Sequence, residues 1–136
     1  MLKIVYGVRG TGKSRRMCSG ANQRLEAARG TVVFIDKDTD HMYDLNREVR
    51  FINASEYGVV GMDMLMGFVA GIAARDFDLD ALFINSFAKL AAAPVNEQQK
   101  IIAFLDELSQ KSGVDIMLAV NGGDLPCPDF MQKYLI

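Results

Sequence analysis

One short segment of the chain has residue types and spacing that can do chemistry. Residues 7–14 fit the phosphate-loop (P-loop) pattern G-x-x-x-x-G-K-[ST] at every fixed position. They are Gly7, Val8, Arg9, Gly10, Thr11, Gly12, Lys13 and Ser14. In such a loop, backbone N–H groups surround phosphate groups, and the N-terminus of the following helix adds partial positive charge. The pattern therefore predicts a phosphate-binding site.

The residues of this loop have separable roles. We expect Gly7, Gly10 and Gly12 to adopt positive φ angles and to allow close approach of a ligand. Lys13 would reach the β- and γ-phosphates of a nucleotide, and the Ser14 hydroxyl would ligate Mg²⁺.

Two arginines near the loop are further candidates for nucleotide binding. For Arg9 there are three alternatives: it contacts a phosphate, it provides a cation to the site of a neighbouring subunit, or it faces solvent. Arg15 and Arg16 follow Ser14 directly, and either one of them, with Arg15 the candidate, lies near a base or ribose, or both are solvated on the helix surface.

The elements around the loop agree with a phosphate site. Residues 2–6 are an apolar, β-prone run, and a helix-like stretch follows at 14–29. Apolar residues at helical spacing should turn one face of this helix toward a sheet. They are Met17, Ala21, Leu25 and Ala28. Gly30 is expected to end the helix.

Further apolar runs predict strands at 31–35, 49–52, 81–84 and 114–120. A short helix is expected at 44–48, and a loop or short helix at 86–94. Asn96 is expected to cap a helix that runs to Lys111 and ends at Gly113.

Residues 58–75 form a long apolar stretch that Asp63 interrupts. As a membrane helix this stretch is slightly short, and Asp63 would be costly near the centre of a bilayer. We expect instead a helix that is buried or covered by a partner. The segment is therefore our candidate contact for a homo-oligomer or another protein.

Strands that alternate with helices predict an α/β fold. It would be a three-layer sandwich with a mostly parallel sheet, in a single domain spanning residues 1–136. Ligands bind such sheets beyond the carboxyl ends of the strands. This rule places residues 7–14, residues 36–40, Asn85 with Ser86, and Asn121 at one rim.

Composition excludes several classes of protein. The net charge of −2 and the lack of a basic stripe argue against a nucleic-acid surface. The first predicted strand leaves no room for a signal peptide, so we expect a cytoplasmic protein that is not membrane-bound. Cys18 and Cys127 lack the spacing of a zinc or disulfide motif, and His41 has no second histidine for a metal pair.

Several segments together resemble the core of the RecA/KaiC/RadA-type ATPases, a group of P-loop NTPases. The sequence Gly-Thr-Gly-Lys at 10–13 is common in their phosphate loop, and residues 82–90 resemble their second motif, a hydrophobic strand that ends in Asp-Ser. The resemblance covers roughly residues 1–123. It implies a RecA-like fold, ATP and Mg²⁺ as ligands, and action as an oligomer.

By position, the resemblance implies roles for polar residues at the rim. Asn85 stands where the family has the Asp that orients the Mg²⁺ shell, and Asn121 where it often places a group that senses the γ-phosphate. Asp36 or Asp38 stands near the family's catalytic Glu, so Lys13, Asp36 and Asp38 are the candidate catalytic residues. The alternatives are a strand-end amide that satisfies backbone groups at Asn85, and solvated or capping carboxylates at Asp36 and Asp38.

The departures from the family pattern predict weak hydrolysis. Asn85 is neutral, and an amide should hold the Mg²⁺ water shell less well than a carboxylate. Asp is also shorter than the family's Glu. If the chain hydrolyses ATP, Asn85→Asp is expected to raise the rate.

Three functions remain open at this stage. The first is an ATP-binding protein with weak Mg²⁺-dependent ATPase activity that switches or assembles through its nucleotide. The second is a catalytically degenerate nucleotide-binding module that regulates a protein partner. The third is a small-molecule kinase, for which the chain lacks an arginine-rich lid. A role on DNA would rest on fold-level analogy alone, so nucleic acid is not an expected partner.

Overall fold

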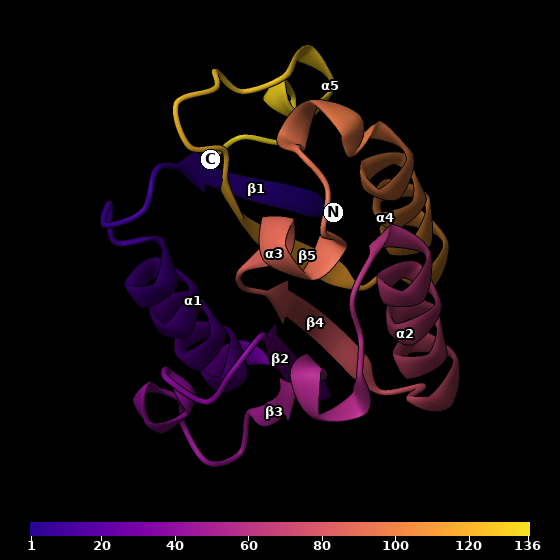
Figure 1. The fold of residues 1–136 in the computed structure, drawn as a ribbon. Coiled ribbons are helices and arrows are strands. Elements are labelled where there is room, and N and C mark those ends of the chain that lie inside the picture. Colours follow the sequence, from indigo (N-terminus) through magenta and orange to yellow (C-terminus); the bar gives the residue numbers. More distant parts are fainter.

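A five-stranded sheet forms the centre of the computed structural model, which describes residues 1–136 (Figure 1). The strands are β1 (Leu2–Gly7), β2 (Thr31–Asp36), β3 (Arg50–Asn53), β4 (Leu79–Ile84) and β5 (Asp115–Asn121). Their order is β1-β5-β4-β2-β3, and every pairing is parallel. The predicted α/β class is confirmed.

Helices cover both faces of the sheet. α1 (Lys13–Ala27) packs on one face. The other face carries α2 (Met62–Arg75), α3 (Phe87–Ala91), α4 (Gln99–Ser112) and α5 (Asp129–Gln132). Figure 1 shows α1 on one side of the strands and the α2–α4 pair on the other. Three 3₁₀ turns complete the chain: η1 (Met42–Asp44), η2 (Ala54–Tyr57) and η3 (Val95–Glu97).

The central strands are apolar nearly throughout because both of their faces are buried. In β2, Val33 and Ile35 join the larger core cluster under α2 and α4, whereas Val32 and Phe34 join the smaller cluster under α1. Phe34 stacks between rings on both neighbouring strands, at 6.2 Å from Phe51 and 6.3 Å from Phe83. This row of rings fixes the register of the sheet beneath α1.

The structure corrects three predicted boundaries. α1 ends at Ala27, and the following Ala28 is already extended, so Gly30 does not end the helix. A Cβ at Gly30 would lie 1.9 Å from the Asp78 carbonyl oxygen, which explains the glycine. The predicted short helix at 44–48 does not form: the 3₁₀ turn η1 ends at Asp44, and residues 45–48 are not helical. Asn96 lies inside η3, and α4 begins after Gln98 without a side-chain cap.

The apolar stretch 58–75 contains a helix of 14 residues, α2, preceded by two glycines with positive φ angles. Leu65, Met66 and Val69 are buried in the core, whereas Met64 is exposed. None of the helices combines the length and the apolar character that crossing a membrane requires.

The last residues of the chain lie along the outer edge of β1. Ile4 N–H donates to Tyr134 O at 2.8 Å, and Ile136 N–H donates to Ile4 O at 3.1 Å. Leu135 therefore forms a parallel bridge with Ile4. This contact partly protects the free edge of the strand that leads into residues 7–14.

Candidate functional site

The carboxyl ends of β1, β5, β4 and β2 surround a groove of about 1040 Å³. The side chains and glycines that line it come mainly from residues 9–22, 37–44 and 85–89, with Ala119 and Asn121 from β5. The predicted rim is therefore present, and residues far apart in the sequence meet there.

The loop 7–14 has a backbone suited to an anion. Gly10 and Gly12 have φ angles of 86° and 82°, a region that favours glycine. Gly7 does not have a positive φ, which corrects our expectation. A Cβ at Gly7 would lie 3.0 Å from Thr11 Oγ1, so a larger residue there would crowd the Thr11 side chain.

The N-terminus of α1 is uncapped. No side chain accepts from its N–H groups, and its first turn contains no acidic residue. The first backbone hydrogen bond of the helix runs from Arg16 N–H to Gly12 O at 3.0 Å. The backbone N–H groups of residues 10–15 therefore donate to no backbone carbonyl. Such a row of free donors at the positive end of a helix is suited to binding an anion.

Lys13 and Thr11 both fold back onto the loop. Lys13 Nζ donates to Val8 O at 2.6 Å, and Thr11 Oγ1 donates to the same carbonyl at 2.8 Å. Partial burial lowers the pKa of Lys13 from its ordinary value. Because burial disfavours the ammonium ion, an anion in the groove would be a favourable partner for it.

A chain of hydrogen bonds links the loop to the ends of β4 and β2. Asn85 Nδ2 donates to Ser14 Oγ at 3.1 Å and to Asp36 Oδ2 at 3.0 Å. Asp36 Oδ1 accepts from the N–H of Lys37 at 2.8 Å. Asp36 and Asn85 are only 1% and 2% exposed. The carboxylate of Asp36 therefore lies behind Asn85 and does not line the groove.

Asp38 is held differently, although it is only two residues further on. Its carboxylate pairs with Lys37 Nζ at 2.8 Å and accepts from Asp40 N–H at 3.0 Å. The hydrogen bond from Lys37, together with that from Asp40, lowers the pKa of Asp38. Asp38 is not among the residues that line the groove, and no hydrogen bond joins it to Asn85.

The remaining predicted nucleotide-binding residues lie at the groove or beside it. Arg9, Arg15 and Asn121 are exposed and line it. Asn121 Oδ1 accepts from Gly123 N–H at 2.9 Å, so this side chain also shapes the turn after β5. The carbonyl oxygen of Val8 accepts the hydrogen bond from Lys13, and the Val8 side chain is exposed.

The groove also contains residues that sequence reasoning did not select. They include Cys18 and Asn22, which lie one and two helical turns after Ser14 on the same stripe of α1, a spacing visible in the sequence as i, i+4, i+8. Burial, with smaller effects of nearby carboxylates, raises the pKa of Cys18 to about 11. The Cys18 thiol that lines the groove is therefore protonated at neutral pH and is not a nucleophile. Lys89, from α3, is a further cation at the groove.

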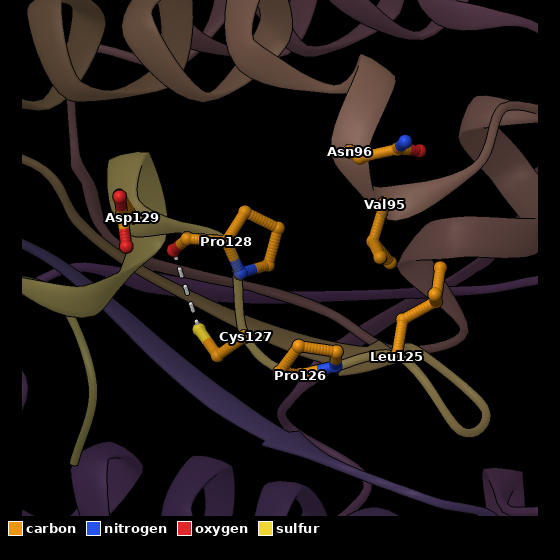
Figure 2. A pocket seen from close by; sticks show the side chains of 7 residues that line it. All are labelled: Val95, Asn96, Leu125, Pro126, Cys127, Pro128 and Asp129. Atoms are coloured by element: carbon orange, nitrogen blue, oxygen red, sulfur yellow. Dashed lines mark hydrogen bonds between the residues drawn. The ribbon is translucent and has the colours of Figure 1, made fainter.

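A second, smaller hollow of about 340 Å³ lies between η3 and the C-terminal tail (Figure 2). Val95 enters from η3, and Leu125 and Pro126 enter from the tail. Cys127 Sγ lies 3.7 Å from Pro128 O, within the same turn. No cation or cluster of charged side chains lines this hollow, so its chemistry differs from that of the groove.

No group of three or more His, Cys, Asp or Glu side chains in the structure could hold a metal ion by itself.

The comparisons with known proteins concern the fold. No protein-family profile and no curated protein sequence matches this chain. Among solved structures, the chain is similar to the flagellar accessory protein FlaH from Methanocaldococcus jannaschii, with a TM-score of 0.63 and 18% sequence identity. The fold is RecA-like. The similarity covers 92% of this chain but only 62% of FlaH. At this level of identity it establishes the architecture and leaves the ligand to be argued from the site.

Proposed function

We propose that this RecA-like chain binds a nucleoside triphosphate, ATP in the first instance, through residues 7–14. One observation carries the proposal: the N–H groups of residues 10–15 donate to no backbone carbonyl, at the uncapped start of α1. These donors border a groove that also holds the cations of Arg9, Lys13 and Arg15. A polyphosphate matches this combination of N–H donors and positive charge.

Magnesium fits the residues at this site as a companion of the triphosphate. The Ser14 hydroxyl lines the groove and would be the protein ligand, with phosphate oxygens completing most of the shell. The ion would neutralise charge on the phosphate oxygens. Asn85 cannot supply a carboxylate, and its amide nitrogen points at Ser14.

The orientation of Asn85 bears on hydrolysis. Neither predicted catalytic carboxylate lines the groove, because Asp36 is screened by Asn85 and Asp38 is paired with Lys37. The carboxylates that do line it belong to Asp40 and Asp44, further along the chain. Asp36 and Asp38 are thus not placed to accept a proton directly from a water that attacks a bound phosphate. We infer slow Mg²⁺-dependent ATPase activity at most, so that the bound nucleotide acts mainly as a switch or in assembly.

A catalytically degenerate regulatory module is the second candidate, and the same Asn85 contact favours it. Such a module would bind ATP without turnover and act through a protein partner in the cytoplasm. Residues 58–75 are the proposed contact for that partner or for a second copy, because Met64, Val60 and Tyr57 are exposed around the start of α2.

The test is calorimetric titration of ATP with Mg²⁺ into the native chain and into Lys13→Ala. Arg29→Ala is the matched control, since it removes a cation beyond the far end of α1. We expect native and Arg29→Ala to bind alike and Lys13→Ala to bind at least about tenfold more weakly. Equal binding by all three chains would refute a phosphate site at residues 7–14.

Release of ADP, followed on the same samples, separates the two candidates. Slow release that Lys13→Ala abolishes supports an ATPase. Binding without release supports the regulatory module. Transfer of phosphate to a small molecule would instead indicate a kinase.

A further inference from the structure

The carboxylate of Asp36 is buried without a cationic partner. It forms no ion pair, because the nearby Lys37 ammonium pairs with Asp38 instead. Its two oxygens accept only from Lys37 N–H and from the Asn85 amide. A buried carboxylate is costly unless a cation or several hydrogen bonds compensate it. The position of Asp36 therefore calls for positive charge close by.

Asn85 links Asp36 to Ser14 at the groove. Asn85 Nδ2 lies 3.0 Å from Asp36 Oδ2 and 3.1 Å from Ser14 Oγ, so one amide group joins the two. Because Asp36 can only accept hydrogen bonds when ionised, it holds the NH₂ end of Asn85 in this direction. Ser14 Oγ then accepts from Asn85, which leaves its own O–H free to donate.

We propose that Asp36 provides the negative charge for a magnesium ion at Ser14, and that Asn85 is the positioning residue that connects them. The inference rests on the proposed function, since the ion arrives with the triphosphate. In this arrangement the acidic group stands at the end of β2, and the amide stands at the end of β4. The divalent cation in turn is the positive charge that buried Asp36 lacks.

Exchange of the two residues tests this proposal. In the double variant Asp36→Asn with Asn85→Asp, residue 36 can accept from Lys37 N–H and donate to residue 85, which can accept from Ser14 O–H. Every hydrogen bond of the chain is retained, and one negative charge remains. The single variant Asp36→Asn keeps the shape but removes the charge.

The measurement is the gain in ATP affinity on replacing EDTA by Mg²⁺, determined by calorimetry. We expect ATP affinity to rise with Mg²⁺ in the native chain and in the exchanged double variant. In Asp36→Asn, this rise in affinity should be smaller than in the native chain by at least about tenfold. Affinity in EDTA should be similar in all three chains. Thermal unfolding of the same samples checks that each variant is folded.

Several results would overturn the proposal. It fails if folded Asp36→Asn keeps the native gain, or if Asp38→Asn loses the gain in its place. If Asp36→Asn does not fold, the double variant decides alone, and a folded double variant without a gain refutes the proposal. A native chain that binds ATP equally with Mg²⁺ and EDTA refutes this inference but not phosphate binding. A native chain that binds ATP in neither condition refutes both.

Discussion

The side-chain amide of Asn85 donates to Asp36 Oδ2 across 3.0 Å and so joins the carboxyl ends of β4 and β2. The contact changes what a carboxylate at position 85 would do. From the sequence, Asn85→Asp is expected to restore an acidic metal site and to raise the rate of hydrolysis. In the structure, the new carboxylate would face that of Asp36 at hydrogen-bonding distance.

Asn85→Asp alone should therefore destabilise the fold. Two buried carboxylates in contact repel one another, and we expect a loss of about 3 kcal/mol in the free energy of unfolding. Urea unfolding near neutral pH measures it. Asn96→Asp, on the exposed surface of η3, is the matched control and should change stability by less than about 0.5 kcal/mol. Native stability in Asn85→Asp would contradict this account of the contact.

Gly30 and Gly71 should respond oppositely to alanine. A Cβ at Gly30 would lie 1.9 Å from the Asp78 backbone carbonyl, so Gly30→Ala should cost about 2 kcal/mol or more. At Gly71, on the exposed side of α2, a Cβ meets nothing within 4 Å. Gly71→Ala should therefore stabilise the protein by about 0.5 to 1 kcal/mol. Chemical unfolding of both variants tests the pair, and equal effects would be inconsistent with the packing described.

Phe34 should dominate the stability of the face under α1. It is fully buried and stacks between Phe51 and Phe83, so Phe34→Ala should cost about 3 to 5 kcal/mol. Phe77 is 98% exposed and provides the control. Phe77→Ala should leave the melting temperature nearly unchanged. A mild effect of Phe34→Ala would show that the row of rings does not hold the sheet together.

The contact between Tyr134 and Asp106 should make stability depend on pH. Tyr134 Oη donates to Asp106 Oδ2 at 2.7 Å and fastens the C-terminal residues to α4. This hydrogen bond holds the pKa of Asp106 below its ordinary 3.8. Burial, together with the bond to Asp106, raises the pKa of Tyr134 to about 12.

The sign of the pH effect follows from these two shifts. A lowered carboxyl pKa contributes stability above its unfolded value, and this is lost as the pH falls through the native value. A raised phenol pKa contributes stability below about pH 10, and this is lost as the pH rises toward 12. Tyr134→Phe should cost about 1 kcal/mol near neutral pH. The difference from native should shrink at both extremes. A difference that is constant with pH would rule out the contact as its source.

Much of the fold was predictable because the signals were local and redundant. The apolar runs that became β2, β4 and β5 are each covered on both faces, and the periodicity at Met17 and Ala21 correctly oriented α1. The prediction for Gly30 was wrong because a contact with a residue distant in the sequence determines the residue type there. Gly30 is a glycine because of Asp78, which belongs to the turn before another strand.

The candidate site was only partly predictable, for a related reason. Parallel strands bring their carboxyl ends to one rim, so the meeting of residues 7–14 with Asn85 and Asn121 follows from strand order. Strand order does not determine which acidic residue contacts Asn85. Asp36 and Asp38 are equivalent candidates in the sequence. They differ in the structure because β2 ends at Asp36, which is buried, whereas Asp38 lies beyond the strand and pairs with Lys37.

The most direct test of the central claim locates the bound nucleotide by NMR. We would record the backbone amide signals of the native chain during titration with ATP and Mg²⁺. Binding through residues 7–14 predicts large shifts for Gly10, Gly12, Lys13 and Ser14. Small shifts are expected for Phe77, which precedes β4, is exposed and does not line the groove. Saturating ATP that leaves the loop signals unmoved would contradict the claim that residues 7–14 form a phosphate site.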